Sequence, residues 1–183
     1  MAIDKVVSAS ITTDAVGPTQ LNEAANYDFT GTVTGAGVTN TPSFMAANSG
    51  GQTLTNSATN VLAGNSEIYD SDSAYDNSSY RFTVPSGKGG KYLFGLGCQF
   101  ETNAAGRMDN FALRIRVNGS TVIDAADYPG GSTENRIPYK YTSGILNLSA
   151  ADYVEPAAYI SLSSGTPTIT NGTLTFYGIK ITD

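Results

Sequence analysis

Hydrophobic and polar positions divide the chain into two stretches of different character. From Pro42 onward, short runs of β-branched and aromatic residues are separated by Gly, Asn, Asp, Ser and Pro, a pattern that predicts short strands joined by turns. Leu113 and Ile115 alternate with Arg114 and Arg116. Because successive side chains of a strand point to opposite sides of its sheet, we expect this strand to bury one side and to present cations on the other.

Ten strands are predicted from these runs, and two of them flank the clearest turn signal in the chain. Asn118 and Gly119 form that turn, because both residues tolerate the positive φ that a type I′ hairpin requires. Short strands at this spacing favour a sandwich or a barrel, and no helical period persists along the chain. The predicted strands are 43–47, 52–62, 67–69, 80–84, 90–101, 111–117, 120–127, 136–148, 153–161 and 174–182.

Residues 1–40 carry too few large apolar side chains to build a core of their own. We expect an extended docking arm that ends in a Gly-rich linker over 31–40, followed by one head domain over 41–183. Regularly spaced apolar residues that form no core of their own usually become buried on another chain. The arm residues expected to do so are Val6, Ile11, Val16, Leu21, Tyr27 and Phe29.

The composition is that of a folded protein whose surface is polar but weakly charged. Hydrophobic residues make up 40% of the chain and aromatic residues 10%, enough to bury a core, whereas charged residues make up only 14%. The net charge is −6, and no run of Lys or Arg offers a footprint for nucleic acid. No apolar stretch approaches the roughly 20 residues that span a bilayer, so we expect no membrane partner.

The start of the chain and its single cysteine bear on where the protein is made. The first residues have neither the basic nor the apolar region of an export signal, so we expect synthesis in the cytoplasm of the producing cell without export. Cys98 is the only cysteine, which excludes an internal disulfide. It lies in an apolar run and is expected to be a small core residue.

The sequence offers few of the side chains that catalysis needs. It contains no histidine, which excludes Ser-His-Asp and Cys-His nucleophile activation and imidazole metal ligands. Two of its 16 acidic residues would suffice for glycoside hydrolysis, but carboxylates scattered over a polar surface are more often solvated turn residues. We therefore expect no enzymatic activity and no cofactor.

One acidic turn superficially resembles a calcium loop. Asp70, Asp72 and Asp76 are spaced as oxygen ligands, but Ala74 stands where a further ligand is expected, and no Gly or Glu completes the pattern. We expect these carboxylates to cap a turn rather than to bind a metal.

Residues 75–100 carry an ordered series of aromatic, proline and glycine positions. A Tyr-Asp turn is followed by Phe in a strand, then by a Pro-x-Gly turn and a Gly-x-Tyr-x-Phe strand. This order resembles the signature of the complement globular-head family, relatives of tumour necrosis factor. The flanking segments 42–44, 146–154 and 174–181 resemble the family's opening strand, its Leu-x-x-Gly-Asp-x-Val segment and its closing strand.

The resemblance implies an all-β, ten-stranded jelly-roll sandwich that assembles as a homotrimer, with aromatic and aliphatic residues along the three-fold axis. The chain departs from the family at Ala151, which replaces a Gly, and at Lys88 and Gly89, which lengthen a turn; no collagen-like repeat precedes the head. The aromatic residues that the resemblance assigns to the core or the trimer contact are Phe44, Tyr75, Phe82, Tyr92, Phe94, Phe176 and Tyr177.

The arm carries a second resemblance. Its phrases Thr-Asp-Ala-Val and Phe-Thr-Gly-Thr-Val, within 11–35, are similar to the N-terminal regions of tailed-phage fibres and other virion proteins. Joined to a trimeric head, this favours a phage virion protein: a capsid decoration, a head fibre or the knob of a tail fibre. The expected partners are copies of itself and a major capsid or tail protein, and the expected location is the virion.

A receptor- or carbohydrate-binding head of a tail fibre stays open as the alternative. Tyrosine combines flat apolar area with a polar tip, which suits a sugar as well as a protein interface. On this alternative, the loop expected to contact a host glycan carries Tyr128, Tyr139 and Tyr141.

Overall fold

The computed structural model describes residues 41–102, 107–127 and 137–182, and these form strands and turns without a helix. None of the described residues therefore belongs to a helix that could cross a membrane. The predicted docking arm, 1–40, lies outside the described residues. The strands are β1 (Ser43–Ala47), β2 (Gln52–Thr53), β3 (Ala58–Val61), β4 (Ser66–Asp70), β5 (Tyr75–Asp76), β6 (Arg81–Thr83), β7 (Gly90–Thr102), β8 (Arg107–Val117), β9 (Ser120–Asp127), β10 (Tyr139–Leu148), β11 (Tyr153–Ser164), β12 (Pro167–Ile169) and β13 (Thr175–Thr182).

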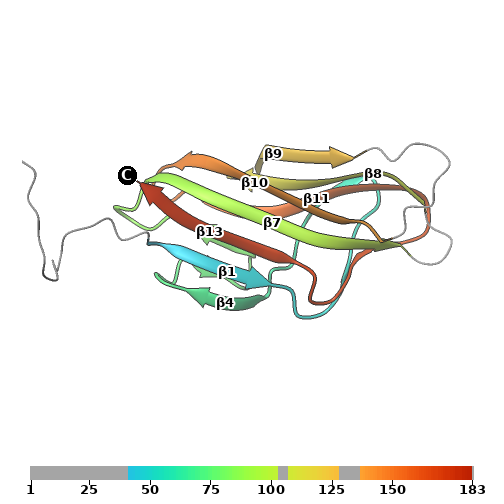
Figure 1. Ribbon diagram of the computed structural model, residues 1–183, viewed down its shortest axis with the longest axis horizontal. Helices are drawn as coiled ribbons and strands as arrows, with labels where there is room; N and C mark the ends of the chain where they lie inside the picture. The colour runs from blue at the N-terminus through green and yellow to red at the C-terminus, as the bar shows by residue number, and fades with distance from the viewer. Residues whose placement is uncertain (1–40, 103–106, 128–136, 183) are drawn as a thin grey trace, which may run out of the picture. The chain divides into compact units, whose positions relative to one another are not determined.

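Two antiparallel sheets form the layers of a sandwich (Figure 1). The seven-stranded sheet runs in the order β2-β12-β7-β13-β1-β4, with β10 also paired to β7. The six-stranded sheet runs β5-β6-β11-β8-β9, with β3 also paired to β11. Neighbours in these sheets are mostly distant in sequence, as in a jelly roll, and β4 and β10 are outer strands of the larger sheet.

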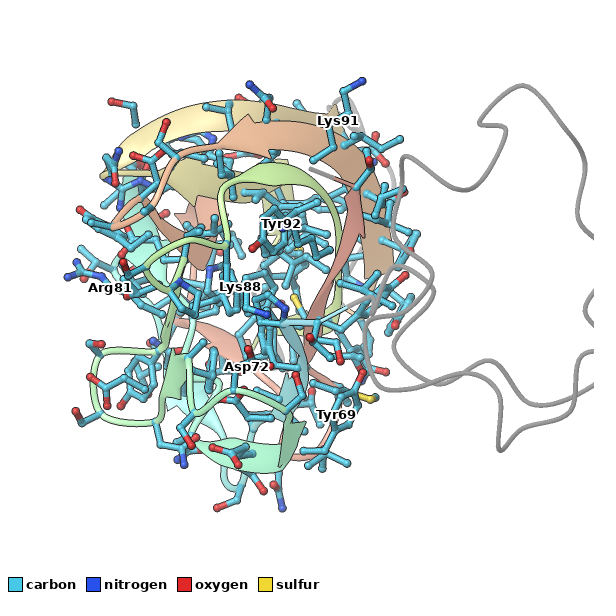
Figure 2. All side chains as sticks on the ribbon, turned by 90° about the vertical axis from the view of Figure 1, so that its left-hand side faces the viewer. Tyr69, Asp72, Arg81, Lys88, Lys91 and Tyr92 are labelled. Atoms are coloured by element: carbon cyan, nitrogen blue, oxygen red, sulfur yellow. The ribbon has the colours of Figure 1, made fainter. Side chains whose placement is uncertain are left out.

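The core lies between the sheets and is rich in aromatic rings. Phe44 of β1 stacks on Phe82 of β6 with ring centroids 4.9 Å apart, and Phe94 of β7 stacks on Phe176 of β13 at 6.1 Å. All four side chains are buried, because alternate residues of each strand face the opposite sheet. In Figure 2, which looks onto one end of the sandwich, Tyr92 lies between the two layers.

The expected fold class, an all-β jelly-roll sandwich, is confirmed. Every predicted strand region contains a strand, and 120–127 is reproduced to the residue as β9. The turn between β8 and β9 has φ of 50° at Asn118 and 80° at Gly119, as the type I′ hairpin requires. Two strands, β5 and β12, were not predicted, since runs of two and three residues carry too little alternation to be seen.

The cations on the outward side of β8 do not stand free in solvent. Arg116 contacts the carboxylate of Glu155 with Nη1 2.8 Å from Oε1, and Arg81 donates from Nε to Oε2, also at 2.8 Å. Arg114 pairs with Asp124 at 3.0 Å. Leu113 and Ile115 are buried on the other side, so the predicted alternation holds, but the outward charges are neutralised by neighbours.

Candidate self-association face

The outward side of the seven-stranded sheet carries an unusual surface that we call the tyrosine face. Phe94 and Leu96 of β7 point into the core, so the intervening Leu93, Gly95 and Gly97 point outward. Strand pairing places outward residues of β4, β1, β13 and β10 beside them. The rows across the sheet are Tyr69–Met45–Tyr177–Gly95–Ser143, Ala47–Thr175–Gly97–Tyr141 and Ser43–Ile179–Leu93–Ile145.

Two glycines form the floor on which tyrosine rings lie. A Cβ atom at Gly95 would overlap the ring of Tyr177, and one at Gly97 would lie 2.5 Å from the hydroxyl of Tyr139 and 3.3 Å from the ring of Tyr141. Any larger residue at these positions would lift the rings off the sheet. The glycines therefore allow the tyrosines to lie flat, which keeps the face smooth.

A hydrogen bond locks two of these rings together. The hydroxyls of Tyr141 and Tyr177 lie 2.7 Å apart. This bond, together with partial burial, raises the pKa of the Tyr177 hydroxyl. A tyrosine pair held in this way presents a fixed shape, since each ring loses its freedom to rotate before any partner arrives.

The tyrosine face is apolar and largely open to solvent. Tyr139 is 59% exposed, Tyr141 50% and Ile145 63%. None of the residues in its three rows is charged. A contiguous exposed surface of this kind marks an interaction site, because single soluble chains rarely leave large apolar patches in contact with water.

The exposed apolar side chains extend to both edges of the sheet. Within the described residues, the exposed large hydrophobics lie on β4, β9, β10 and β13 or directly before β10: Ile68, Tyr69, Val122, Ile137, Tyr139, Tyr141, Ile145 and Ile181. β9 and β10 are neighbours, since Ile123 of β9 contacts Gly144 of β10. One apolar area thus lies at the β9–β10 edge and another around β4, at the opposite edge of the sheet.

The seven aromatic residues that the resemblance assigns to the core or the trimer contact divide between the core and the tyrosine face. Tyr177 lies on the tyrosine face, and its half-buried ring is available to a partner. The remaining six lie in the core of one chain and have almost no surface to offer a partner: Phe44, Tyr75, Phe82, Tyr92, Phe94 and Phe176.

The tyrosines assigned to a glycan loop need a correction. Tyr139 and Tyr141 belong to strand β10 and not to a loop, because the run 139–148 pairs along its whole length with β7. Their side chains lie on the tyrosine face. Tyr128 lies outside the described residues, as do the arm residues Val6, Ile11, Val16, Leu21, Tyr27 and Phe29.

The carboxylates of the acidic turn accept hydrogen bonds from neighbouring residues of the same turn. Asp70 accepts from the backbone N–H groups of Asp72 and Tyr75. The hydroxyls of Ser79 and Ser78 donate to Asp76 and lower its pKa to about 2. Asp72 lies near Lys88, with 3.9 Å between Oδ2 and Nζ, at the end of the sandwich seen in Figure 2. Within the described part of the chain, no three such side chains gather to hold a metal ion.

Sequence reasoning missed most of the tyrosine face, although a signal was present. In the run 91–97, Leu93, Gly95 and Gly97 alternate with large core residues, and glycines at alternate positions of a strand indicate that something lies against it. Tyr139, Tyr141 and Ile145 likewise share one side of β10. Which side of the sandwich these residues occupy follows only from the strand pairing.

Comparison with known proteins supports the fold and nothing finer. No family model matches the chain, and no curated protein matches it in sequence. The head has the jelly-roll fold of complement globular heads and tumour necrosis factor-like proteins. Among solved structures, the globular domain of zebrafish complement 1qA protein aligns with a TM-score of 0.55 at 14% identity, covering 77% of this chain and 98% of its own.

Two further structures share this fold. Murine APRIL aligns with a TM-score of 0.54 at 10% identity, over 76% of this chain and 98% of its own. Vertex protein P5 of the phage PRD1 aligns with a TM-score of 0.57 at 14% identity, over 79% of this chain and all of its own. None of the three is named as an enzyme.

Proposed function

We propose that this chain is a structural protein of a phage virion, whose heads associate as a homotrimer through the tyrosine face and whose residues 1–40 attach it to the particle. It serves as a capsid decoration or as the knob of a short fibre. The observation that carries the proposal is an exposed, uncharged tyrosine face on a fold shared with a phage vertex protein. The resemblance of the arm to virion proteins points the same way.

The composition of the tyrosine face suits a permanent contact between copies. Tyrosine and methionine are enriched in the buried centre of protein interfaces, whereas Lys, Glu and Asp are depleted there. Tyr69, Met45, Tyr177 and Tyr141 follow that preference, and the three rows themselves hold no charge that would need desolvation. The ring pair of Tyr141 and Tyr177 is already fixed, so association costs little side-chain entropy.

Two separate apolar areas favour a closed ring of copies. If the β9–β10 edge of one chain packs on the β4 side of the next, each copy uses two different surfaces, and such a head-to-tail contact forms a ring when its rotation closes after a whole number of copies. Three is the number that the resemblance to complement globular heads implies. A stable contact of this kind buries roughly 1,600 Å² in total.

Sedimentation of the full-length chain tests the head contact. We expect the wild type to sediment as three chains and Ile145→Glu, on the tyrosine face, to sediment as one. Thr83→Glu is the matched control, because Thr83 is exposed on β6 of the other sheet. A wild-type monomer, or equal behaviour of the two variants, contradicts the proposal.

Attachment is tested on particles. Ile11→Asp and Leu21→Asp in the arm should abolish incorporation of the protein into purified virions while the trimer persists. Copy number per particle, measured by quantitative mass spectrometry, separates a capsid decoration from a tail knob. Incorporation that is unchanged by both substitutions contradicts a docking role for the arm.

One specific observation favours the alternative function, glycan binding. Tyr139 and Tyr141 are at least half exposed and lie two residues apart on the same side of β10, which would allow a sugar to stack on them. The same residues cannot be buried between copies and bind a host glycan at once. Tyr139→Ala should therefore weaken either self-association or glycan-array binding, and the outcome separates the two functions.

A further inference from the structure

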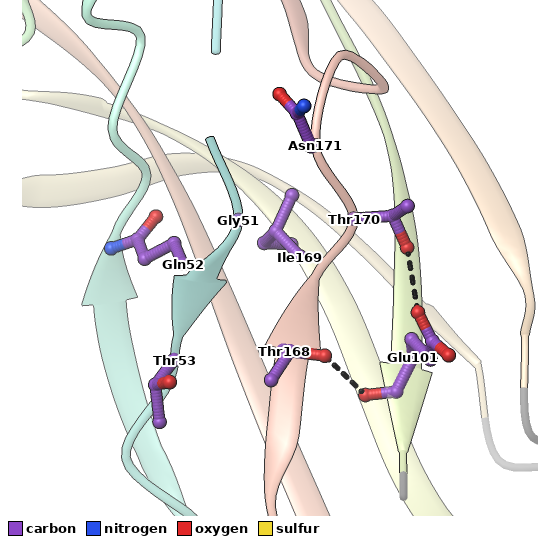
Figure 3. A pocket seen from close by; sticks show the side chains of 8 residues that line it. All are labelled: Gly51, Gln52, Thr53, Glu101, Thr168, Ile169, Thr170 and Asn171. Carbon is purple, nitrogen blue, oxygen red and sulfur yellow. Dashed lines mark hydrogen bonds between the residues drawn. The ribbon is translucent and has the colours of Figure 1, made fainter. Parts of the chain in front are cut away.

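A polar groove lies where three strands of the seven-stranded sheet run side by side. Its volume is about 360 Å³, and Figure 3 shows β2, β12 and the last residues of β7 forming it. Thr53, Thr168 and Glu101 occupy one row across these strands. The residues that line the groove are Gly51, Gln52, Thr53, Glu101, Thr168, Ile169, Thr170 and Asn171.

One wall of the groove is a carboxylate held in a fixed position. Thr170 donates from Oγ1 to Oε2 of Glu101 at 3.1 Å, and Gln99 donates in turn to the hydroxyl of Thr170 at 3.3 Å. Thr168 donates to the backbone carbonyl of Glu101 at 3.2 Å (Figure 3). Within the described residues, Oε1 of Glu101 has no such partner, so one acceptor oxygen is left for a ligand.

The opposite end of the groove supplies a donor. The side-chain oxygen of Asn171 accepts from the N–H of Gly50 at 2.6 Å, which fixes the amide and leaves its NH₂ group without a partner among the described residues. The hydroxyl of Thr53 is likewise unengaged within that part of the chain. Gln52 is different, because both ends of its amide bond to the backbone at Val61 and Ala63.

The chemistry of these groups selects a ligand class. Among the described residues that line the groove, Glu101 alone is charged, and the whole chain carries −6, so an anionic ligand is repelled. The described lining contains a single large apolar residue, Ile169, which gives little to an apolar ligand. A carboxylate oxygen, an amide NH₂ and a hydroxyl together match the neighbouring hydroxyls of a neutral sugar, each of which both donates and accepts.

We propose that this groove binds a neutral sugar ring, with Glu101 accepting from its hydroxyls and Asn171 donating to them. Fixed carboxylate and amide groups lose no side-chain entropy on binding, so a shallow site still selects its ligand. This site is distinct from Tyr139 and Tyr141.

The position of the groove fits a role in contacting a cell surface. The described head begins at Thr41 and Pro42, and the carbonyl of Pro42 accepts from the N–H of Lys180, whose strand pairs with the start of β7. At about 3.3 Å per residue, Glu101 lies about 33 Å along β7 from Lys91. The groove is thus at the end of the head away from its first described residues. Only the source of the sugar, a host surface polysaccharide, rests on the proposed virion function.

Saturation-transfer NMR on the full-length chain tests binding, with methyl glycosides of glucose, galactose and mannose as neutral probes and glucuronic acid as the anionic probe. We expect at least one neutral probe to bind and the acid not to bind. Glu101→Gln and Asn171→Ala should each weaken binding about tenfold or more, since the first replaces a charged acceptor with a neutral amide and the second removes the NH₂ donor. Glu67→Gln, an exposed carboxylate on β4 of the same sheet, is the matched control.

Thr53→Val keeps the test decisive if Glu101→Gln fails to fold, because Thr53 is exposed and its change should weaken binding without loss of structure. Absence of binding by all neutral probes, preference for the acid, or equal effects of Glu101→Gln and Glu67→Gln would overturn the sugar site. Sedimentation of the same variants reports separately on the trimer. A trimer that binds no sugar refutes the groove alone, and a sugar-binding monomer refutes the proposed assembly alone.

Discussion

The outward sides of the two sheets expose different kinds of residue to water. On the six-stranded sheet, charged residues pair with one another, as Arg116 and Arg81 do around Glu155. On the seven-stranded sheet, the tyrosine face has no charge in its three rows and leaves Tyr141 and Ile145 half or more exposed. The paired charges of the six-stranded sheet need no partner, whereas the uncharged, exposed rows of the tyrosine face are the surface that we propose a second copy covers.

The largest expected effect is on the charged side. Glu155→Gln removes the carboxylate that pairs with both Arg81 and Arg116, and Glu155 itself is 1% exposed. Removing this buried carboxylate leaves two partly exposed guanidinium groups without their counter-charge, at the low end of the cost of breaking a buried pair, about 3 kcal/mol of folding stability. Urea unfolding should show this loss, with the subunit composition in native buffer unchanged. A change in self-association without a loss of stability would contradict the division between the two sides.

The second effect concerns the floor of the tyrosine face. Gly95→Ala places a methyl group where the ring of Tyr177 lies, so the ring must move away from the sheet. We expect a loss of about 1 to 3 kcal/mol, the usual cost of overpacking, and weaker self-association. Sedimentation at several concentrations measures the association. Gly50→Ala is a control without steric conflict, since nothing lies near its Cβ position, although its φ of 102° adds backbone strain.

Strands were predicted well from the sequence where apolar and polar residues alternate over enough positions of a single strand. The Leu113–Ile115 alternation and the Asn118–Gly119 turn are local, and both are found as predicted. The run 52–62 was predicted as one strand but is two. The chain crosses between sheets there, with Ser57 at a φ of 56° and β2 and β3 in different layers. Such a crossing leaves no mark on the hydrophobic pattern.

The candidate sites were harder to predict because they depend on pairing between distant residues. Phe176 and Tyr177 are adjacent and both aromatic, yet one lies in the core and the other on the tyrosine face. Arg81 and Glu155 are 74 positions apart, so their ion pair could not be inferred from spacing. The groove likewise gathers Thr53, Glu101 and Thr168 from three segments of the chain. Only strand register brings such residues together.

A third effect tests the locked tyrosine pair. Tyr177→Phe removes the hydrogen bond to Tyr141 and should cost about 1 kcal/mol. Because the folded pKa of Tyr177 is raised, its contribution is complete below the ordinary tyrosine pKa of 10.0 and is lost as the pH rises through the folded value. Unfolding measured from pH 8 to 11 should therefore show a shallower alkaline loss in the variant. An identical pH profile would mean that the pair contributes nothing.

The smallest effect belongs to the exposed ion pair of the six-stranded sheet. Arg114 contacts Asp124 at 3.0 Å, and its guanidinium lies 5.1 Å from the ring centre of Tyr159. Asp124 is 42% exposed, so solvent screens the pair, and Arg114→Ala should cost below about 1 kcal/mol. The loss should shrink further in 1 M NaCl, measured by urea unfolding. A loss as large as that of Glu155→Gln would show that solvent exposure does not distinguish the two ion pairs. The contrast between the outward sides of the two sheets would then depend on the tyrosine face alone.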